Sequence, residues 1–468
     1  METEKKICIQ NAEVYDPAQN WNGEHRDLYI AEGKISTPFD DPDIVIDAGG
    51  KPAMAGGIDP YCHLASPGQI FAKMTTKHLL SPDEIGKAYA RMGYVHAHQP
   101  FTTLLTAREV QRSLNLIPYI DKSFRVSIDL RDMGKNIKTK KHLAFCDEAR
   151  ALIHLTGAIG LFLTFPYLKH KQQYYIQKNV SAKKAFEFFS AIEDQDIFPI
   201  AIWGMPDLLE KEIPVPDRFL ISDLNKSLKS ETSMANAKKF LDAGGKADIG
   251  LNHGEEYLSV NSIDKYLPGT LSIDAGIHNP YPLRYETIQD PLESEESLPG
   301  WMLMGNINEN RQIALSSISP PSGDMNRIPV VTAWLMNNDE RPQSIENTLG
   351  EKIMGLFEIA RLTRLEPARQ IGLDDSGHLK TGARANVAIY DLKPDMGFHK
   401  KVKALSNCWC LIKDGKPVRE NGSFSNSIPS SKIRYREIDF DPSILKHTDL
   451  LQNPTLRLEN LSITKNQK

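Results

Sequence analysis

The chain has 468 residues, of which 40% are hydrophobic and 25% are charged, a composition typical of a folded protein with ample apolar material for a large core. Its formal net charge of −4 gives no overall reason to expect nucleic acid or an anionic membrane surface as a partner. No apolar run reaches the length that crosses a bilayer, and the first residues lack the apolar core of a signal peptide, so we expect a cytoplasmic location.

Short strands are predicted at both ends of the chain. Residues 1–52 contain β-branched, alternating runs separated by turn residues, and a matching group fills residues 380–435. Within the second group, Asp414-Gly415 is a strong signal for a hairpin turn. We therefore expect one small β-sandwich domain built from both ends of the chain, followed by residues 436–468 as a loosely held tail.

The middle of the chain, residues 53–379, alternates between helical and strand-like runs. Residues 81–93 are typical of a helix that begins at Ser81, and residues 197–204 are typical of a buried strand. Repeated strand–helix units of this kind indicate a parallel sheet with helices outside it, most economically a (β/α)8 barrel. The predicted fold class is therefore α/β, with a barrel and a second, smaller β-domain.

One short stretch, residues 57–63, has most of a metal-binding pattern. It reads GIDPYCH, which follows the pattern Gly-x-x-Asp-x-His-x-His except that Tyr61 stands at the first histidine position. Two histidines one residue apart point to the same face of a strand and can bind one metal ion. Only His63 remains here, while Asp59 is kept and is expected to structure the strand end.

Residues 45–63 resemble the first barrel strand of the amidohydrolase superfamily. Within it the chain is most similar to the A subunits of formylmethanofuran dehydrogenase and of the formyltransferase/hydrolase complex. The stretches that carry this resemblance are 88–122, 269–278, 328–337 and 356–392. The resemblance implies an amidohydrolase-type barrel and a two-zinc hydrolase that releases formate from N-formylmethanofuran, in which the metals activate a bridging water. It also implies a ligand set of a His-x-His pair, a carboxylated lysine and two further histidines, with an aspartate as general base.

Most of these family positions are changed in this chain. Tyr61 and His63 occupy the His-x-His position, Phe162 occupies the lysine position, and Ile318 occupies the position of the last-strand aspartate. The strand at residues 197–204 supplies no histidine, and His253 lies about one residue away from the next expected ligand. A phenyl ring has no lone pair for zinc, so a bridge of the family type is not expected.

Three other features suggest chemistry but have simpler explanations. His96 and His98 form a literal His-x-His on a probable strand, yet zinc needs three or four ligands and no further partners are readable nearby. Cys408 and Cys410 share one face of a strand, and buried thiols are the simpler reading because no second pair has suitable spacing. The basic run at residues 135–142 could receive the acidic tail of a methanofuran-type carrier, or it is a solvated surface.

Two main hypotheses follow. In the preferred one the chain is a catalytically degenerate member of the A-subunit family, a scaffold or regulator. It associates with the B, C and D subunits of a formyltransferase/hydrolase complex and with a methanofuran-type carrier, and no metal or other cofactor is expected. In the alternative it is an active amidohydrolase that uses zinc, and Tyr61, His63, His96 and His98 converge at the C-terminal mouth of the barrel. A third, weaker reading is an assembly protein without a link to one-carbon metabolism.

Overall fold

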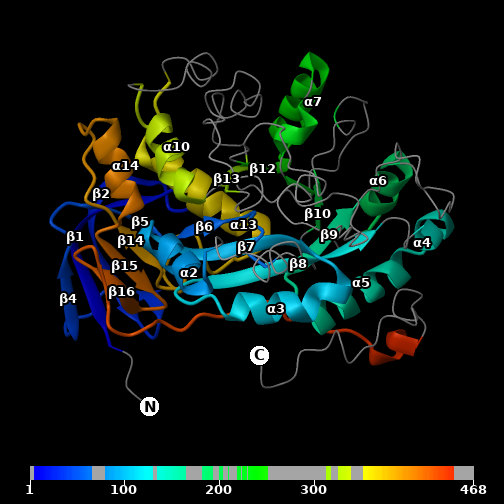
Figure 1. Cartoon of the computed structure of the whole chain (residues 1–468), viewed down its shortest axis with the longest axis horizontal. Coiled ribbons are helices and arrows are strands. Elements are labelled where there is room, and N and C mark those ends of the chain that lie inside the picture. Colours follow the sequence, from blue (N-terminus) through cyan, green and yellow to red (C-terminus); the bar gives the residue numbers. More distant parts are fainter. Residues whose placement is uncertain are drawn as a thin grey trace, which may run out of the picture.

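The computed structural model describes residues 5–65, 80–129, 134–164, 182–192, 200–203, 209, 219–222, 224–228, 230–250, 312–317, 325–338 and 352–446. The strands form two separate sheets, one at the side of the molecule that combines strands β1–β5 with β14–β17 and one that curves through its centre (Figure 1). Ile318, His253 and the stretch 269–278 lie outside the described residues.

The first sheet is mixed, has nine strands and joins both ends of the chain. Its strands are β1 Ile7–Asp16, β2 Trp21–Ala31, β3 Lys34–Ser36, β4 Ile44–Asp47, β5 Pro52–Ala55, β14 Val387–Ile389, β15 Cys410–Lys413, β16 Lys416–Glu420 and β17 Ser423–Phe424. The order is β17-β16-β15-β14-β5-β1-β2-β3, with β4 paired to β1. The N-terminal strands and the C-terminal strands therefore meet where β5 pairs with β14.

The nine-stranded sheet folds back on itself around an apolar interior. The main chain of Ile35 in β3 exchanges hydrogen bonds of 2.8 Å with Gly382 and Ala383, which precede β14. Ile7, Ile30, Val387 and Ile412 are among the residues enclosed between the two layers. The hairpin predicted at Asp414-Gly415 is confirmed, because both residues have positive φ, 51° and 73°, as a tight turn between β15 and β16 requires. The expectation of a small β-domain from both ends of the chain is confirmed as well.

The second sheet is entirely parallel and has eight strands. They are β6 Gly57–Asp59, β7 Tyr94–Thr102, β8 Asp121–Asp129, β9 Gly160–Thr164, β10 Ile200–Trp203, β11 Leu220–Ser222, β12 Lys246–Gly250 and β13 Gln312–Ser316. Each strand pairs with the next one along the chain, from β6 to β13. This arrangement is a nearly closed parallel barrel, as the alternation of strands and helices predicts.

Helices surround the barrel and cover its outer face (Figure 1). The α-helices are α2 Pro82–Arg91, α3 Ala107–Asn115, α4 Gly134–Thr139, α5 His142–Thr156, α6 Ala182–Ser190, α7 Glu231–Asp242, α10 Ile328–Leu335, α12 Leu356–Ala360, α13 Glu366–Ile371 and α14 Phe398–Ser406. The short 3-10 helices are η1 Leu104–Thr106, η3 Leu224–Ser227, η5 Met325–Arg327 and η7 Pro442–Lys446, whereas η6 Arg361–Leu365 is a π-helical segment that joins α12 to α13. None of the helices in the described part of the chain is long and apolar enough to cross a membrane.

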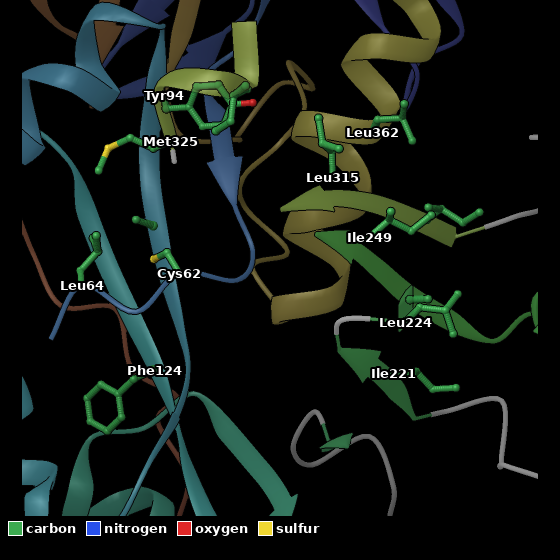
Figure 2. Packing of buried hydrophobic residues seen from close by; sticks show 14 of the residues in the cluster. Cys62, Leu64, Tyr94, Phe124, Ile221, Leu224, Ile249, Leu315, Met325 and Leu362 are labelled. Carbon is green, nitrogen blue, oxygen red and sulfur yellow. The ribbon is translucent and has the colours of Figure 1, made fainter. Parts of the chain in front are cut away.

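The start of α2 follows directly from its sequence. Ser81 caps the helix by accepting a hydrogen bond from the main-chain N–H of Glu84, and the Glu84 carboxylate accepts one from the N–H of Ser81. The predicted helix start is therefore confirmed. The buried face of such helices packs against outward-pointing strand residues, among which Phe124, Ile221 and Leu315 are visible in Figure 2.

A buried arginine joins the barrel to the nine-stranded sheet. Arg364 donates hydrogen bonds to the main-chain oxygen of Ala55 at 3.3 Å and to the Tyr390 hydroxyl oxygen at 2.7 Å. The Tyr390 hydroxyl in turn donates to the main-chain oxygen of Met92 at 2.8 Å. Gly93 has a positive φ of 80°, and a Cβ there would lie only 2.3 Å from the Tyr390 hydroxyl oxygen, so glycine is required at this close approach.

The segment that follows β17 runs along the N-terminal end of the barrel. Ile433 forms a parallel bridge with Lys122 at the start of β8, and the main-chain N–H of Arg436 donates to the oxygen of Ala158. The ring of His154 packs against that of Phe440 in a tilted arrangement, with ring centroids 4.9 Å apart. The first residues of the expected tail thus contact the barrel, and the division of the chain into 1–52 with 380–435, 53–379 and 436–468 stays a prediction.

Candidate functional site

Asp59, the part of the strand-end motif that this chain keeps, connects the first and last strands of the barrel. Its carboxylate accepts hydrogen bonds from the main-chain N–H of Ser317 at 3.1 Å and from the Ser317 hydroxyl, and Ser317 directly follows β13. It also accepts one from the Tyr89 hydroxyl of α2 at 2.6 Å. Burial raises the pKa of Asp59, and the hydrogen bonds from Ser317 and Tyr89 oppose this rise. The carboxylate therefore holds the ends of β6 and β13 together, as expected for a residue that structures the strand end.

Four rings pack together at the positions where the resemblance implies metal ligands. Tyr61 and His63 follow β6, Phe101 lies near the end of β7, and Phe162 lies on β9; we call these four residues the mouth cluster. The ring centroids of Tyr61 and His63 are 5.2 Å apart, those of His63 and Phe101 5.6 Å, and those of Phe101 and Phe162 5.2 Å. Such edge-on and tilted contacts are the favourable arrangement of aromatic rings.

Phe162 sits in an apolar environment inside the barrel. Its side chain is completely buried and clusters with Phe101, Ala201 of β10 and Leu220 of β11. No group among these can accept or donate a strong hydrogen bond through its side chain. Phe162 therefore packs against apolar side chains, and an ammonium or carbamate group at this position would find no polar partner among these three residues.

His96 and His98 face the barrel interior and belong to a continuous chain of hydrogen bonds. The Ser123 hydroxyl oxygen lies 2.8 Å from Nε2 of His96 and 2.7 Å from Nδ1 of His98. Nη1 of Arg125 lies 2.9 Å from Nε2 of His98. We call His96, His98, Ser123 and Arg125 the histidine chain. Ser123 and Arg125 are two residues apart on β8 and so point to the same face.

The direction of each hydrogen bond in the histidine chain follows from chemistry. A guanidinium has no acceptor, so Arg125 donates to Nε2 of His98, and the proton of that ring is on Nδ1. Nδ1–H of His98 then donates to the Ser123 oxygen. Ser123 has a single hydroxyl proton, which it donates to Nε2 of His96. Both imidazoles are neutral in this arrangement, and burial lowers the pKa of each well below its usual value.

The histidine chain does not offer a metal site. The lone pairs of Nε2 on His96 and on His98 both accept hydrogen bonds, and a cation bound to His98 would lie beside the guanidinium of Arg125. The pKa of Arg125 is lowered to about 10 by burial, so the side chain is charged at neutral pH. Zinc needs unprotonated ligands without such a competing cation.

The four residues that the active-enzyme hypothesis brings together fall into two groups with different partners. They are Tyr61, His63, His96 and His98. Tyr61 and His63 contact aromatic rings, whereas the two other histidines bond to Ser123 and Arg125. Over the residues that the structure describes, no three His, Cys, Asp or Glu side chains come together in a way that could hold a metal ion. Among the family positions that the structure describes, Tyr61, His63 and Phe162 therefore do not fit the two-zinc centre that the resemblance implies.

The two cysteines singled out in the sequence are buried thiols. Sγ of Cys408 lies 3.6 Å from the main-chain oxygen of Ala90, and Cys410 begins β15. Burial raises the pKa of Cys408 to about 12 and raises that of Cys410 as well, so neither thiol ionises readily to the thiolate that binds metals. All five cysteines lie in described parts of the chain and form no disulfide.

The basic run 135–142 spans the end of α4 and the start of α5. Lys138, Lys140 and Lys141 are exposed there. This exposure agrees with a solvated surface.

The sequence pattern missed Ser123, Arg125 and Gln370. Arg125 donates to the main-chain oxygen of Gln370 in α13, and Gln370 donates to the oxygens of Ala247 and Gln312 near the starts of β12 and β13. An arginine that alternates with serine on a buried strand is a signal that could have been noticed, because such a side chain must find polar partners inside the barrel.

Comparisons with known proteins agree with this architecture. The family model of the amidohydrolase family matches residues 310–419. Protein FwdA of Methanocaldococcus jannaschii is 22% identical over 518 aligned positions, which cover 89% of this chain and 88% of that protein. The A subunit of the formyltransferase/hydrolase complex Fhc of Methylorubrum extorquens is 23% identical over 497 positions, which cover 88% of both chains.

Solved structures show the same fold. One match is a chain in the crystal structure of the formyltransferase/hydrolase complex FhcABCD from Methylorubrum extorquens with methylofuran. Its TM-score is 0.75 at 19% identity, and the match covers 98% of this chain and 97% of that chain. A D-hydantoinase matches with a TM-score of 0.55 at 15% identity, over 92% of this chain and 99% of the other. The predicted resemblance is thus confirmed: the chain has the barrel fold of these structures and is similar over most of its length to Protein FwdA and to the A subunit of the Fhc complex.

Proposed function

We propose that the chain is a component of a formylmethanofuran dehydrogenase or formyltransferase/hydrolase complex, and that it acts there as a catalytically degenerate scaffold or regulator. The similarity to Protein FwdA and to the A subunit of Fhc over almost nine-tenths of the chain supports the first half of this proposal. Its partners are then the B, C and D subunits, and the methanofuran-type carrier is a candidate ligand.

The mouth cluster carries the second half of the proposal. Phe162 stands where the resemblance places a metal-bridging lysine, and it is completely buried among Phe101, Ala201 and Leu220. An empty metal site would leave buried polar groups without partners, which is costly. Replacement of the bridging residue by a packed aromatic ring removes that cost, and this is the expected outcome when a barrel keeps its fold without its metals.

The proposal predicts that the full-length protein, purified from cells supplied with zinc, holds well below one zinc ion per chain. Elemental mass spectrometry after dialysis measures this content directly. The physical reason is that the histidine chain uses its lone pairs for hydrogen bonds and that the mouth cluster offers few donors. Hydrolysis of an N-formyl substrate by the protein alone should then equal the rate without protein.

About one or more tightly held zinc ions per chain, the minimum for a zinc-activated water, would contradict the degenerate reading and favour the active amidohydrolase. In that case His63→Ala and His96→Ala, made separately, would show which histidine holds the metal. Membership of a complex is tested independently by co-expression with the B, C and D subunits. Elution of the chain apart from all of them would contradict that half of the proposal while leaving the metal result intact.

A further inference from the structure

The histidine chain ends on the helix that covers the N-terminal ends of the barrel strands. Arg125 is fully buried; its Nη1 donates to His98 and its Nη2 donates to the main-chain oxygen of Gln370 at 2.6 Å. Gln370 belongs to α13 and bonds to the beginnings of β12 and β13 through its own side chain. The protonation state of His98 is thus one hydrogen bond away from the contact that fixes α13 to the barrel.

The surroundings of the two imidazoles are rich in fixed positive charge. His98 faces Arg125 on β8 and His96 on its own strand. His96 faces Lys122 of β8, Arg384 before β14, Lys413 of β15 and Arg434 of the segment below the barrel. Two acids lie nearby. Asp121 already pairs with Lys413 at 2.8 Å and with Arg384 at 2.9 Å. Asp248 of β12 faces Arg125 and accepts a hydrogen bond from the Ser316 hydroxyl at 2.8 Å.

We propose that the histidine chain is an acid-sensitive lock that holds α13 against the barrel while both imidazoles are neutral. A proton added to Nε2 of His98 turns an acceptor into a donor that points at the guanidinium of Arg125, so that hydrogen bond is lost and two cations face each other. A proton added to Nε2 of His96 in the same way removes the acceptor for the Ser123 hydroxyl. Either event disrupts the chain, and the first one displaces the arginine that anchors α13.

The pH window follows from the direction of the shifts. Burial, reinforced by the neighbouring cations, lowers the pKa of His96 and His98 in the folded protein, whereas an imidazole in the unfolded chain titrates near 6.5. The unfolded state therefore binds more protons below about pH 6.5, and stability that is fully present above this pH is lost as the pH falls. Between pH 6.5 and the lowered folded-state pKa, each histidine raises the unfolding equilibrium constant about tenfold for each unit by which the pH falls, so both together raise it about a hundredfold per unit.

The experiment is urea unfolding of the full chain at a series of pH values between 7.5 and 5. The variant His98→Gln keeps an oxygen that accepts from Arg125 and an amide that donates to Ser123, but it cannot take up a proton. The slope of the logarithm of its unfolding constant against pH gives the number of protons taken up on unfolding, and this number should be about one lower than in the wild type. Adding His96→Gln should lower the number by about one more. The matched control His25→Gln changes an exposed histidine of β2 and should leave the slope unchanged.

Equal slopes for the wild type and His98→Gln would overturn the proposal. If His98→Gln does not fold, hydrogen–deuterium exchange of the wild type decides the matter. Corrected for the intrinsic pH dependence of exchange, protection of the amides in α13 should fall between pH 7.5 and 5 well before protection in the nine-stranded sheet. Loss of protection that is uniform over both sheets, or absent from α13, would contradict a lock at this place.

Discussion

Replacement of Asp59 by alanine is expected to lower the free energy of unfolding by about 3 to 5 kcal/mol, because buried donors lose their acceptor and each such loss costs about 1 to 3 kcal/mol. The donors are the main-chain N–H and hydroxyl of Ser317, the hydroxyl of Tyr89 and the main-chain N–H of Tyr61. They link β6, the end of β13 and α2, so the change weakens the closure of the barrel rather than a single contact. Chemical denaturation at neutral pH measures the effect.

Two further variants separate the role of the Asp59 carboxylate from a general effect of mutation. Tyr89→Phe removes one of the three hydrogen bonds that Tyr89 and Ser317 donate to Asp59, and it should lower the free energy of unfolding by about 1 kcal/mol. The double variant with Asp59→Ala should lose clearly less than the sum of the two single losses, because both changes remove the same bond. Asp41→Ala changes an exposed acid in the loop before β4 and should stay within about 0.5 kcal/mol of the wild type. If Asp59→Ala were as mild as this control, Asp59 would not hold the barrel ends together.

The fold could be predicted from the sequence because its signals are local and repeated. Alternating strands and helices across the middle of the chain indicate a parallel barrel, and Asp414-Gly415 indicates the hairpin that the structure contains. Ser81 with Glu84 marks a helix start in the same way. Each of these signals depends on residues within one turn or one strand, so no knowledge of distant contacts is needed to read it.

The interior of the barrel could be predicted only in part. The change of a lysine position to Phe162 is visible in the sequence once the family pattern is known, and its apolar surroundings agree with it. The partners of His96 and His98 were not predictable, because Ser123 and Arg125 lie on another strand and the link to Gln370 spans 245 residues of chain. A His-x-His pattern gives the direction of two side chains but says nothing about which groups face them across a barrel.

Phe162→Lys restores the residue type that the resemblance places at this position, and it is expected to destabilise the protein on the order of 5 kcal/mol at neutral pH. The estimate follows from the fall of about 4 pKa units that lysines show when they are buried in apolar surroundings, with about 1.4 kcal/mol for each unit. Phe162→Met keeps most of the volume and no charge, and it should cost less than about 1.5 kcal/mol. Urea midpoints of the two variants at the same pH give the comparison.

The same pair of variants also tests the degenerate reading of the barrel. Lysine at position 162 would still face Phe101, Ala201 and Leu220, with Tyr61 at the first histidine position, so it should recover neither bound zinc nor hydrolysis of an N-formyl substrate. A Phe162→Lys protein that folds as stably as Phe162→Met and takes up zinc would show that the barrel lacks only this one ligand. If it is strongly destabilised and metal-free, the mouth cluster is a repacked core, in which the ring of Phe162 stabilises the barrel at the position where the resemblance places a lysine.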